Sequence, residues 1–246
     1  MEASLQSASS LALLGLGLIF GLKHATEVDH VVAVSTIVTQ NKSLFRSAMV
    51  GALWGIGHTA SLLVAGVIVL SLRVTIPLRV SNWLELCVAF MILILGASAL
   101  WRVLRQKVDV HVHQHSHDDV SHVHVHFHEE STRHSKSKTH SHSVSAIGIK
   151  PVIIGSIHGL AGSGPLTLLV LTQIKSVVLG LLYIAIFGVG AIFGMLFMSG
   201  LVGLPFVLTA SNLTTFHRRL QTAAAVLSIA FGFWYAHMVL SSSHLL

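Results

Sequence analysis

Long apolar stretches constrain the fold of this 246-residue chain more than any other feature of its sequence. A helix needs about 20 mostly apolar residues to cross a bilayer. Because 53% of the residues are hydrophobic and only 10% are charged, the chain is too apolar for a water-soluble domain. We therefore expect an all-α integral membrane protein with six transmembrane helices, over residues 10–38, 47–72, 83–104, 147–172, 176–208 and 219–242.

The first, fourth and fifth of these segments carry features that interrupt a regular helix. The first contains Lys23, Glu27 and Asp29 within an otherwise apolar run, and ionisable groups are costly inside a bilayer. The fourth contains three glycines and a proline over residues 159–165, and the fifth is rich in glycine and ends near Pro205. Because such features are typical of the discontinuous helices of transporters, we expect all three helices to be broken.

Lysines and arginines near the segment ends predict how the chain is oriented. There are 15 of them against nine acidic residues, a net charge of +6. Eleven fall on one side of the expected bilayer and three on the other, and the more basic side is normally the cytoplasm. We expect both termini outside and residues 105–146 inside, in the plasma (inner) membrane. We assign the basic excess to this topology and expect no nucleic-acid partner.

The two halves of the chain resemble each other, which predicts an internal repeat. Residues 21–24 align with 155–158, and residues 46–54 align with 175–183. With three spans in each copy, the second copy must be inverted relative to the first, as in many transporters. The alternative is a chance similarity between apolar helices. We expect a first three-helix repeat over 1–104, a His-rich loop over 105–146 and a second three-helix repeat over 147–246.

The most informative polar cluster lies in the first segment, from His24 to His30. It holds two imidazoles and the carboxylates of Glu27 and Asp29, donors that suit Ni²⁺, Co²⁺ or Zn²⁺ better than Mg²⁺ or Ca²⁺. At about 100° per residue, a straight helix cannot direct all four side chains to one point. Either the segment unwinds after Gly21, or some of these residues bind metal while others orient the ligands. The alternative is a polar turn at the membrane interface.

Two further histidines in apolar surroundings are candidate metal ligands. His58 follows two glycines in the second segment, and His158 precedes the glycine-rich stretch of the fourth. His158 aligns with His24, but the second copy has Ser163 and Gly164 where the first has its Asp-His pair, so the expected site is asymmetric. The alternative for His58 is a hydrogen bond across a helix pair.

The 105–146 loop contains eleven histidines, many of them alternating with other residues. Short His-rich tracts bind late first-row metals with modest selectivity. Strict alternation would put four imidazoles on one side of an extended strand, but the low complexity favours disorder without metal. We therefore expect a disordered loop that buffers, senses or hands off metal; the alternative is an accidental tract.

Missing motifs exclude several classes of protein. Neither a Walker A motif nor H-E-x-x-H is present, which argues against ATP hydrolysis through a P-loop and against a metalloprotease. Cys87 is the single cysteine, so an internal disulfide and a cysteine zinc cluster are excluded. We expect no enzyme and no cofactor. The class that remains is passive or ion-coupled transport, with a divalent metal ion and the lipid bilayer as partners.

Two other classes of function stay open. A membrane-embedded metal sensor or accessory subunit would bind metal and present it to a metallochaperone or to urease or hydrogenase maturation proteins. A Zn²⁺ transporter would share the same ligand chemistry.

The histidine motifs together resemble the nickel/cobalt transporter (NiCoT/NicO) superfamily, particularly its shorter UreH-like members. The matching elements are His24-x₄-Asp29-His30, the Gly-His-Thr around His58, and a histidine followed by Gly-Leu-Ala-Gly-Ser in the fourth segment. This resemblance implies a secondary permease for Ni²⁺ or Co²⁺, with His24, Asp29 and His30 as signature residues and His58 in support. The longer permeases of the superfamily have eight spans. Six spans with a His-rich loop resemble its efflux branch, whereas the first-segment motif favours uptake, which we take as the expected direction.

Histidine ligation predicts that protons compete with the metal. Imidazole in model peptides titrates at about pH 6.5. We hypothesise that metal flux into vesicles, measured as initial rates over a series of pH values, falls as the pH drops through about 6. A flux that stays constant between about pH 5 and 8 would argue against histidine ligands.

Overall fold

A computed structural model describes residues 2–41, 43–72, 76–105, 108–117, 120–129, 148–162, 174, 176–210 and 214–242. Over this part the chain is helical apart from one β-hairpin. The elements, in chain order, are α1 (Glu2–His24), α2 (Val28–Val38), α3 (Leu44–Leu72), α4 (Leu78–Arg105), β1 (Val108–His117), β2 (Val120–Glu129), α5 (Lys150–Gly162), α7 (Val177–Thr209) and α8 (Thr214–Ser242).

Most of the expected membrane spans are present as long helices. By length and composition α3, α4, α7 and α8 can each cross a membrane, and α1 with α2 passes the same test as a bent pair. The chain is therefore a multi-pass membrane protein. The remaining expected span, residues 147–172, is described only through α5, because residues 163–173 lie outside the described part. The break predicted in that span stays a prediction.

The first segment is broken, as its sequence predicts. α1 ends at His24, α2 begins at Val28, and the two helices are bent by 52°. The backbone N–H groups of Thr26 and Glu27 donate to carbonyls three residues earlier, at 2.9 and 3.0 Å. This tighter bonding ends α1, because a regular α-helix bonds over four residues.

The fifth segment is not broken, and the sequence-based prediction of a break there is wrong. α7 continues over 33 residues with Pro205 inside it. Its glycines serve close packing instead: a Cβ at Gly188 would overlap Thr59 of α3, and one at Gly190 would overlap the backbone oxygen of Leu18 in α1. Small residues of this kind let membrane helices approach each other closely.

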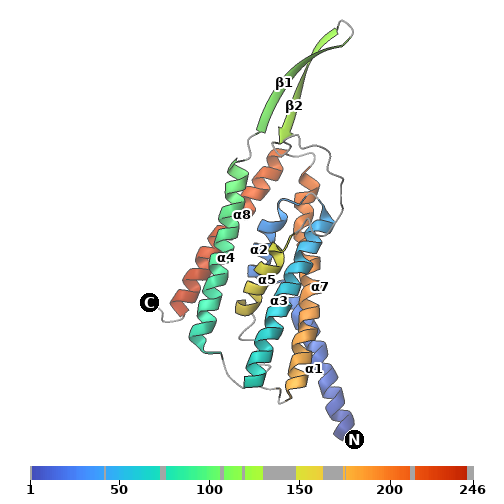
Figure 1. The fold of residues 1–246 in the computed structure, drawn as a ribbon, viewed down its shortest axis with the longest axis vertical. Helices are drawn as coiled ribbons and strands as arrows, with labels where there is room; N and C mark the ends of the chain where they lie inside the picture. Colours follow the sequence, from blue (N-terminus) through green and yellow to red (C-terminus); the bar gives the residue numbers. More distant parts are fainter. Residues whose placement is uncertain are drawn as a thin grey trace.

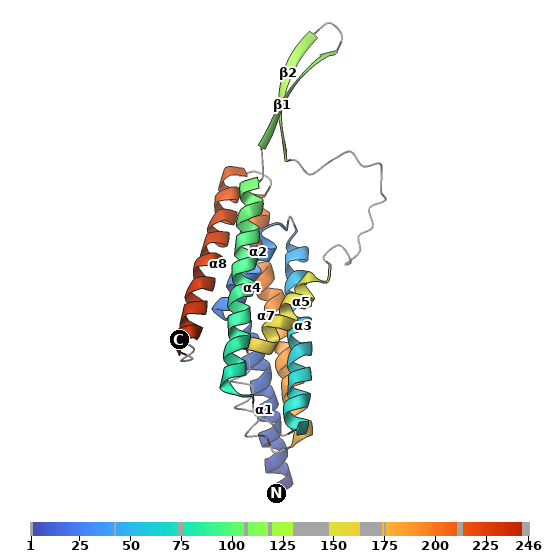
Figure 2. The same cartoon turned by 60° about the vertical axis from the view of Figure 1, so that its left-hand side comes forward.

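The short helices α2 and α5 lie in the middle of the bundle (Figure 1). In both views α3 packs along α7, α4 packs along α8, and the two short helices lie between these pairs (Figures 1 and 2). The first residues of α1 and the last residues of α8 each lie at the end of their helix that points away from the hairpin (Figure 2). The fold thus separates the termini from the hairpin, while the assignment of the hairpin end to the cytoplasm remains a prediction from the charge pattern.

Close helix contacts occur in pairs that exchange the two halves of the chain. For two of these pairs, one contact joins α1 to α7 and its counterpart joins α5 to α3. For the other two, both contacts lie within one helix pair, α3 with α7 or α4 with α8. The pairs are Gly21–Phe187 with Gly155–Trp54, Leu18–Gly190 with Val152–Gly57, Thr59–Gly188 with Ile192–Gly55, and Leu93–Gly232 with Ile229–Gly96.

These exchanged contacts revise one part of the sequence alignment. They equate Trp54 with Phe187, whereas the alignment matches Trp54 to Tyr183, about one helical turn earlier. A shift of one turn keeps apolar residues on the same face of a helix. Sequence similarity alone therefore cannot distinguish the two registers.

β1 and β2 form an antiparallel hairpin inside the His-rich loop. The disorder without metal that the sequence predicts for this loop stays a prediction. The valines that alternate with histidines in both strands are β-branched and repeat with a period of two, which favours an extended chain. Residues 130–146 of the loop lie outside the described part.

Two glycines of α1 give a matched test of the packing. A Cβ at Gly21 would overlap the backbone oxygen of Phe187, so we expect Gly21→Ala to lower the free energy of unfolding by about 1–3 kcal/mol. Gly15 has nothing within 4 Å of such a Cβ, so Gly15→Ala should be neutral or stabilising. Thermal unfolding of the purified protein in detergent measures both; equal stabilities would contradict this packing.

Candidate metal centre

Three histidines from separate places in the sequence meet at the α1–α2 break. His24 is the last residue of α1, His30 lies in the first turn of α2, and His58 lies within α3. The ring centroids are 4.5 Å apart for His24 and His30, 5.0 Å for His24 and His58, and 5.4 Å for His30 and His58. One nitrogen from each ring lies within 4.8 Å of the others. A small shift of the side chains would bring all three to one metal ion, which binds imidazole nitrogen at about 2.0–2.1 Å.

The three imidazoles are buried and incompletely paired. Their exposed fractions are 5% for His24, 1% for His30 and 0% for His58. Within the described part of the chain, Nε2 of His24, Nε2 of His30 and both ring nitrogens of His58 have no hydrogen-bond partner. Leaving a buried polar atom unpaired costs free energy, so such atoms call for a further ligand. A bound cation would satisfy one nitrogen on each ring at once.

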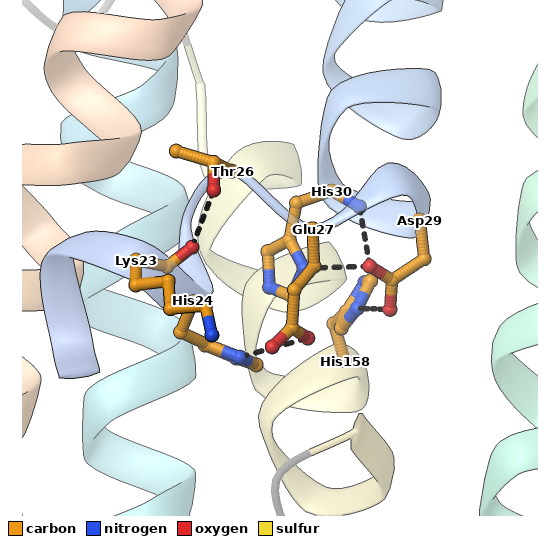
Figure 3. Close-up of polar contacts among 7 residues, drawn as sticks. All are labelled: Lys23, His24, Thr26, Glu27, Asp29, His30 and His158. Atoms are coloured by element: carbon orange, nitrogen blue, oxygen red, sulfur yellow. Dashed lines mark hydrogen bonds and ion pairs between the residues drawn. The ribbon is translucent and has the colours of Figure 1, made fainter.

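Two carboxylates hold the first two rings in place (Figure 3). Glu27 Oε2 lies 3.0 Å from His24 Nδ1. Asp29 Oδ1 lies 3.0 Å from His30 Nδ1 and also accepts the backbone N–H of His30 at 2.8 Å. Because a carboxylate only accepts hydrogen bonds, each Nδ1 carries the proton, and each Nε2 of the neutral ring keeps a lone pair. Metal-binding histidines are commonly held by such a contact on their other nitrogen.

His158 of α5 connects the second half of the chain to this cluster (Figure 3). Its Nε2 donates to Asp29 Oδ2 at 2.9 Å, and its ring centroid lies 4.0 Å from that of His30. Ligand atoms of Asp29, His30 and His158 lie within 4.8 Å of one another. These three residues therefore form a second candidate position, adjacent to the first, and the two positions share His30.

Large aromatic rings line the two positions. Trp54 of α3 is fully buried, and its ring centroid lies 6.1 Å from that of His30 and 5.7 Å from that of His158. Phe187 of α7 lies 5.5 Å from His24 by the same measure. Apolar walls lower the local dielectric and strengthen the attraction between a cation and nearby carboxylates. Neither residue stands out in the sequence as part of a site, although Trp54 precedes His58 by about one helical turn.

The six residues singled out in the sequence lie together in the fold. The helix of the first segment does break, after His24 rather than directly after Gly21, and each carboxylate contacts a ring. That some of these residues bind metal while others orient the ligands stays a prediction. The hydrogen bond considered for His58 is absent from the described residues. An interfacial polar turn does not account for buried imidazoles with unpaired nitrogens. The six are His24, Glu27, Asp29, His30, His58 and His158.

The sequence is extensively similar to a curated protein. It is 37% identical over 227 residues to the protein named urease accessory protein UreH from Bacillus sp. (strain TB-90). The similarity covers 92% of this chain and 91% of that protein, so it extends over both halves. No protein-family model matches the sequence, and no solved structure matches it.

The role assigned to Asp29 gives a prediction about affinity. In Asp29→Asn the charge is lost and one of the two oxygens that accept from His30 and His158 is replaced by a donor. We expect Ni²⁺ to bind about 10–100-fold more weakly, as measured by calorimetry on the purified protein. The control Glu85→Gln removes a carboxylate from α4, outside the cluster, and should leave the affinity unchanged. Equal affinities of wild type and Asp29→Asn would refute this role.

Proposed function

Because the chain belongs to the family of the urease accessory protein UreH, and because its histidines meet at a helix break inside a membrane bundle, we propose that it is a secondary permease for Ni²⁺ or Co²⁺. The metal is the transported substrate, held transiently by ring nitrogens and then released. This assignment agrees with the resemblance of the motifs to the nickel/cobalt transporter superfamily.

The observation that carries the proposal is the set of unpaired ring nitrogens at the break. Neutral imidazoles are ligands for Ni²⁺, Co²⁺ and Zn²⁺, whereas Mg²⁺ and Ca²⁺ prefer oxygen. Glu27 and Asp29 add two negative charges beside these ligands, which balances the charge of a divalent cation. Balanced charge matters here because an uncompensated ion is costly away from water.

Two adjacent positions that share His30 support transport over storage. An ion held by His24, His30 and His58 can exchange its other ligands for Asp29 and His158 while His30 stays bound. Conduction requires sites that bind strongly enough to remove water from the ion and weakly enough to release it, and adjacent sites serve this need.

The exchanged helix contacts support two inverted three-helix repeats around this centre. An inverted repeat gives a transporter two related conformations, in which the halves swap their roles and the site opens to opposite sides. In the structure all four histidines are nearly inaccessible, as expected for an intermediate closed to both sides.

An accessory function is the second candidate, and the name of the relative favours it. A membrane protein that accumulates nickel for urease assembly would bind metal at the same histidines and pass it to a maturation protein or metallochaperone. A Zn²⁺ permease would use the same donors. We place the hairpin end in the cytoplasm and favour uptake, from the charge pattern and the first-segment motif.

Purified protein in liposomes with a trapped metal-quenched dye tests the proposal. We expect Ni²⁺ or Co²⁺ to enter with wild-type protein, and His24→Ala and His30→Ala to reduce entry to the rate of empty liposomes, because each removes a ligand. His237→Ala is the matched control, since His237 is an exposed histidine of α8 and should leave the flux unchanged. Binding without entry would reject the permease in favour of the accessory function. If Zn²⁺ entered but Ni²⁺ and Co²⁺ did not, the proposed substrate would be wrong.

Deleting residues 111–142 tests whether the His-rich loop takes part in transport. Because the candidate ligands all lie in the helices, we expect the deletion to change only the dependence of the flux on metal concentration. Loss of flux at every concentration would make the loop part of the transport path.

A further inference from the structure

The short helix α2 carries two residues of the metal centre but is joined only loosely to the helix before it. Asp29 and His30 lie in its first turn, and residues 25–27 connect it to α1 across the 52° bend. It packs against α4, α7 and α8. Apolar contacts are non-directional, so they define the position of a short helix less sharply than hydrogen bonds do. At the start of α2 the contact of Asp29 with His158 serves this purpose.

The other end of α2 is bonded to α8 by Gln221. Its Nε2 donates to the backbone oxygen of Thr39, the residue that caps the C-terminus of α2, at 2.8 Å. Carbonyls at this end of an α-helix lack partners within the helix. Gln221 is 4% exposed, and its Oε1 has no hydrogen-bond partner within the described residues. An apolar side chain of similar size would avoid the cost of that unpaired atom, so the bond to α2 is what the glutamine contributes.

A second contact between the two helices lies seven residues further along α8. The Ser228 hydroxyl lies 3.2 Å from the backbone oxygen of Val32 and 3.0 Å from that of Ala224 in its own helix, so its single hydrogen serves one acceptor or the other. Val32 and Thr39 are also seven residues apart, so α8 runs antiparallel along one face of α2. Of the two side chains, Gln221 is the one that bonds α2 alone.

We propose that Gln221 is a positioning residue of the metal centre, which holds His30 within reach of the ligands on α1 and α3 by bonding the end of α2 to α8. Thr39 lies nine residues after His30, about 14 Å along the helix axis, so Gln221 acts through α2 and contacts no ligand. This inference rests on the proposed binding of metal by the buried histidines, and it does not require transport.

Two substitutions in α8 separate positioning from stability. Gln221→Leu removes the donor at nearly the same volume. The control is Gly232→Ala, whose new Cβ would overlap Leu93 of α4 and so disturb the packing of α8 on α4 rather than on α2. Hydrogen exchange of the full-length, metal-free protein in detergent, followed by mass spectrometry, measures how firmly α2 is held. We expect the backbone amides of residues 28–38 to exchange faster than in wild type in Gln221→Leu only.

Bound Co²⁺ reports the consequence for the centre, because its visible absorption depends on the number and geometry of its ligands. We expect Gln221→Leu to bind Co²⁺ about 10-fold more weakly and with an altered spectrum, since His30 is displaced, and Gly232→Ala to match wild type in both. An unchanged spectrum in Gln221→Leu, or equal changes in the two variants, would overturn the proposal. Failure of the wild type itself to bind Co²⁺ would instead reject the metal centre on which the proposed function rests, and the exchange rates would still decide whether Gln221 holds α2.

Discussion

The contact of Asp29 with two histidines joins candidate metal ligands from the two halves of the chain. Its carboxylate accepts from His30 on the same helix and from His158 on α5, and α5 belongs to the other half of the chain. Such a charge away from water is stable only when hydrogen bonds and opposite charges compensate it. The packing of α5 against the α1–α2 break therefore depends on this polar interaction, which the surrounding apolar contacts cannot replace.

Close helix packing makes this interaction geometrically possible. Gly57 of α3 lets the backbone of α5 approach at Val152, and Gly155 of α5 lets the backbone of α3 approach at Trp54. A larger side chain at either glycine would force the two helices apart. Because His158 is carried on α5, such a separation would also move its ring away from Asp29, so packing and chemistry depend on the same few small residues.

The sequence predicted the apolar segments, the first break and the six residues of the cluster, because each rests on a local pattern. Charged side chains inside an apolar run mark a break, and histidines in such a run mark a site. It did not predict the continuous α7, because glycine permits both a break and close packing, and only the neighbouring helix decides between them.

Other features depend on contacts between segments far apart in the chain. Close contacts such as that of Gly21 with Phe187 join residues far apart in the sequence, and no local pattern contains that information. Likewise, the sequence shows that histidines occupy every second position in parts of the loop. Which residues lie opposite each other across the hairpin follows only from the pairing of the two strands.

Of the two carboxylates at the centre, Glu27 is the more exposed: its side chain is 42% accessible, whereas its partner His24 is only 5% accessible. This contact therefore crosses the boundary between the surroundings of the bundle and its interior. In the permease that we propose, a hydrated cation arriving from that side would meet a full negative charge before any nitrogen. The same carboxylate turns the lone pair of the imidazole inward, so that attraction of the ion and replacement of its water would be divided between the two ends of a single contact.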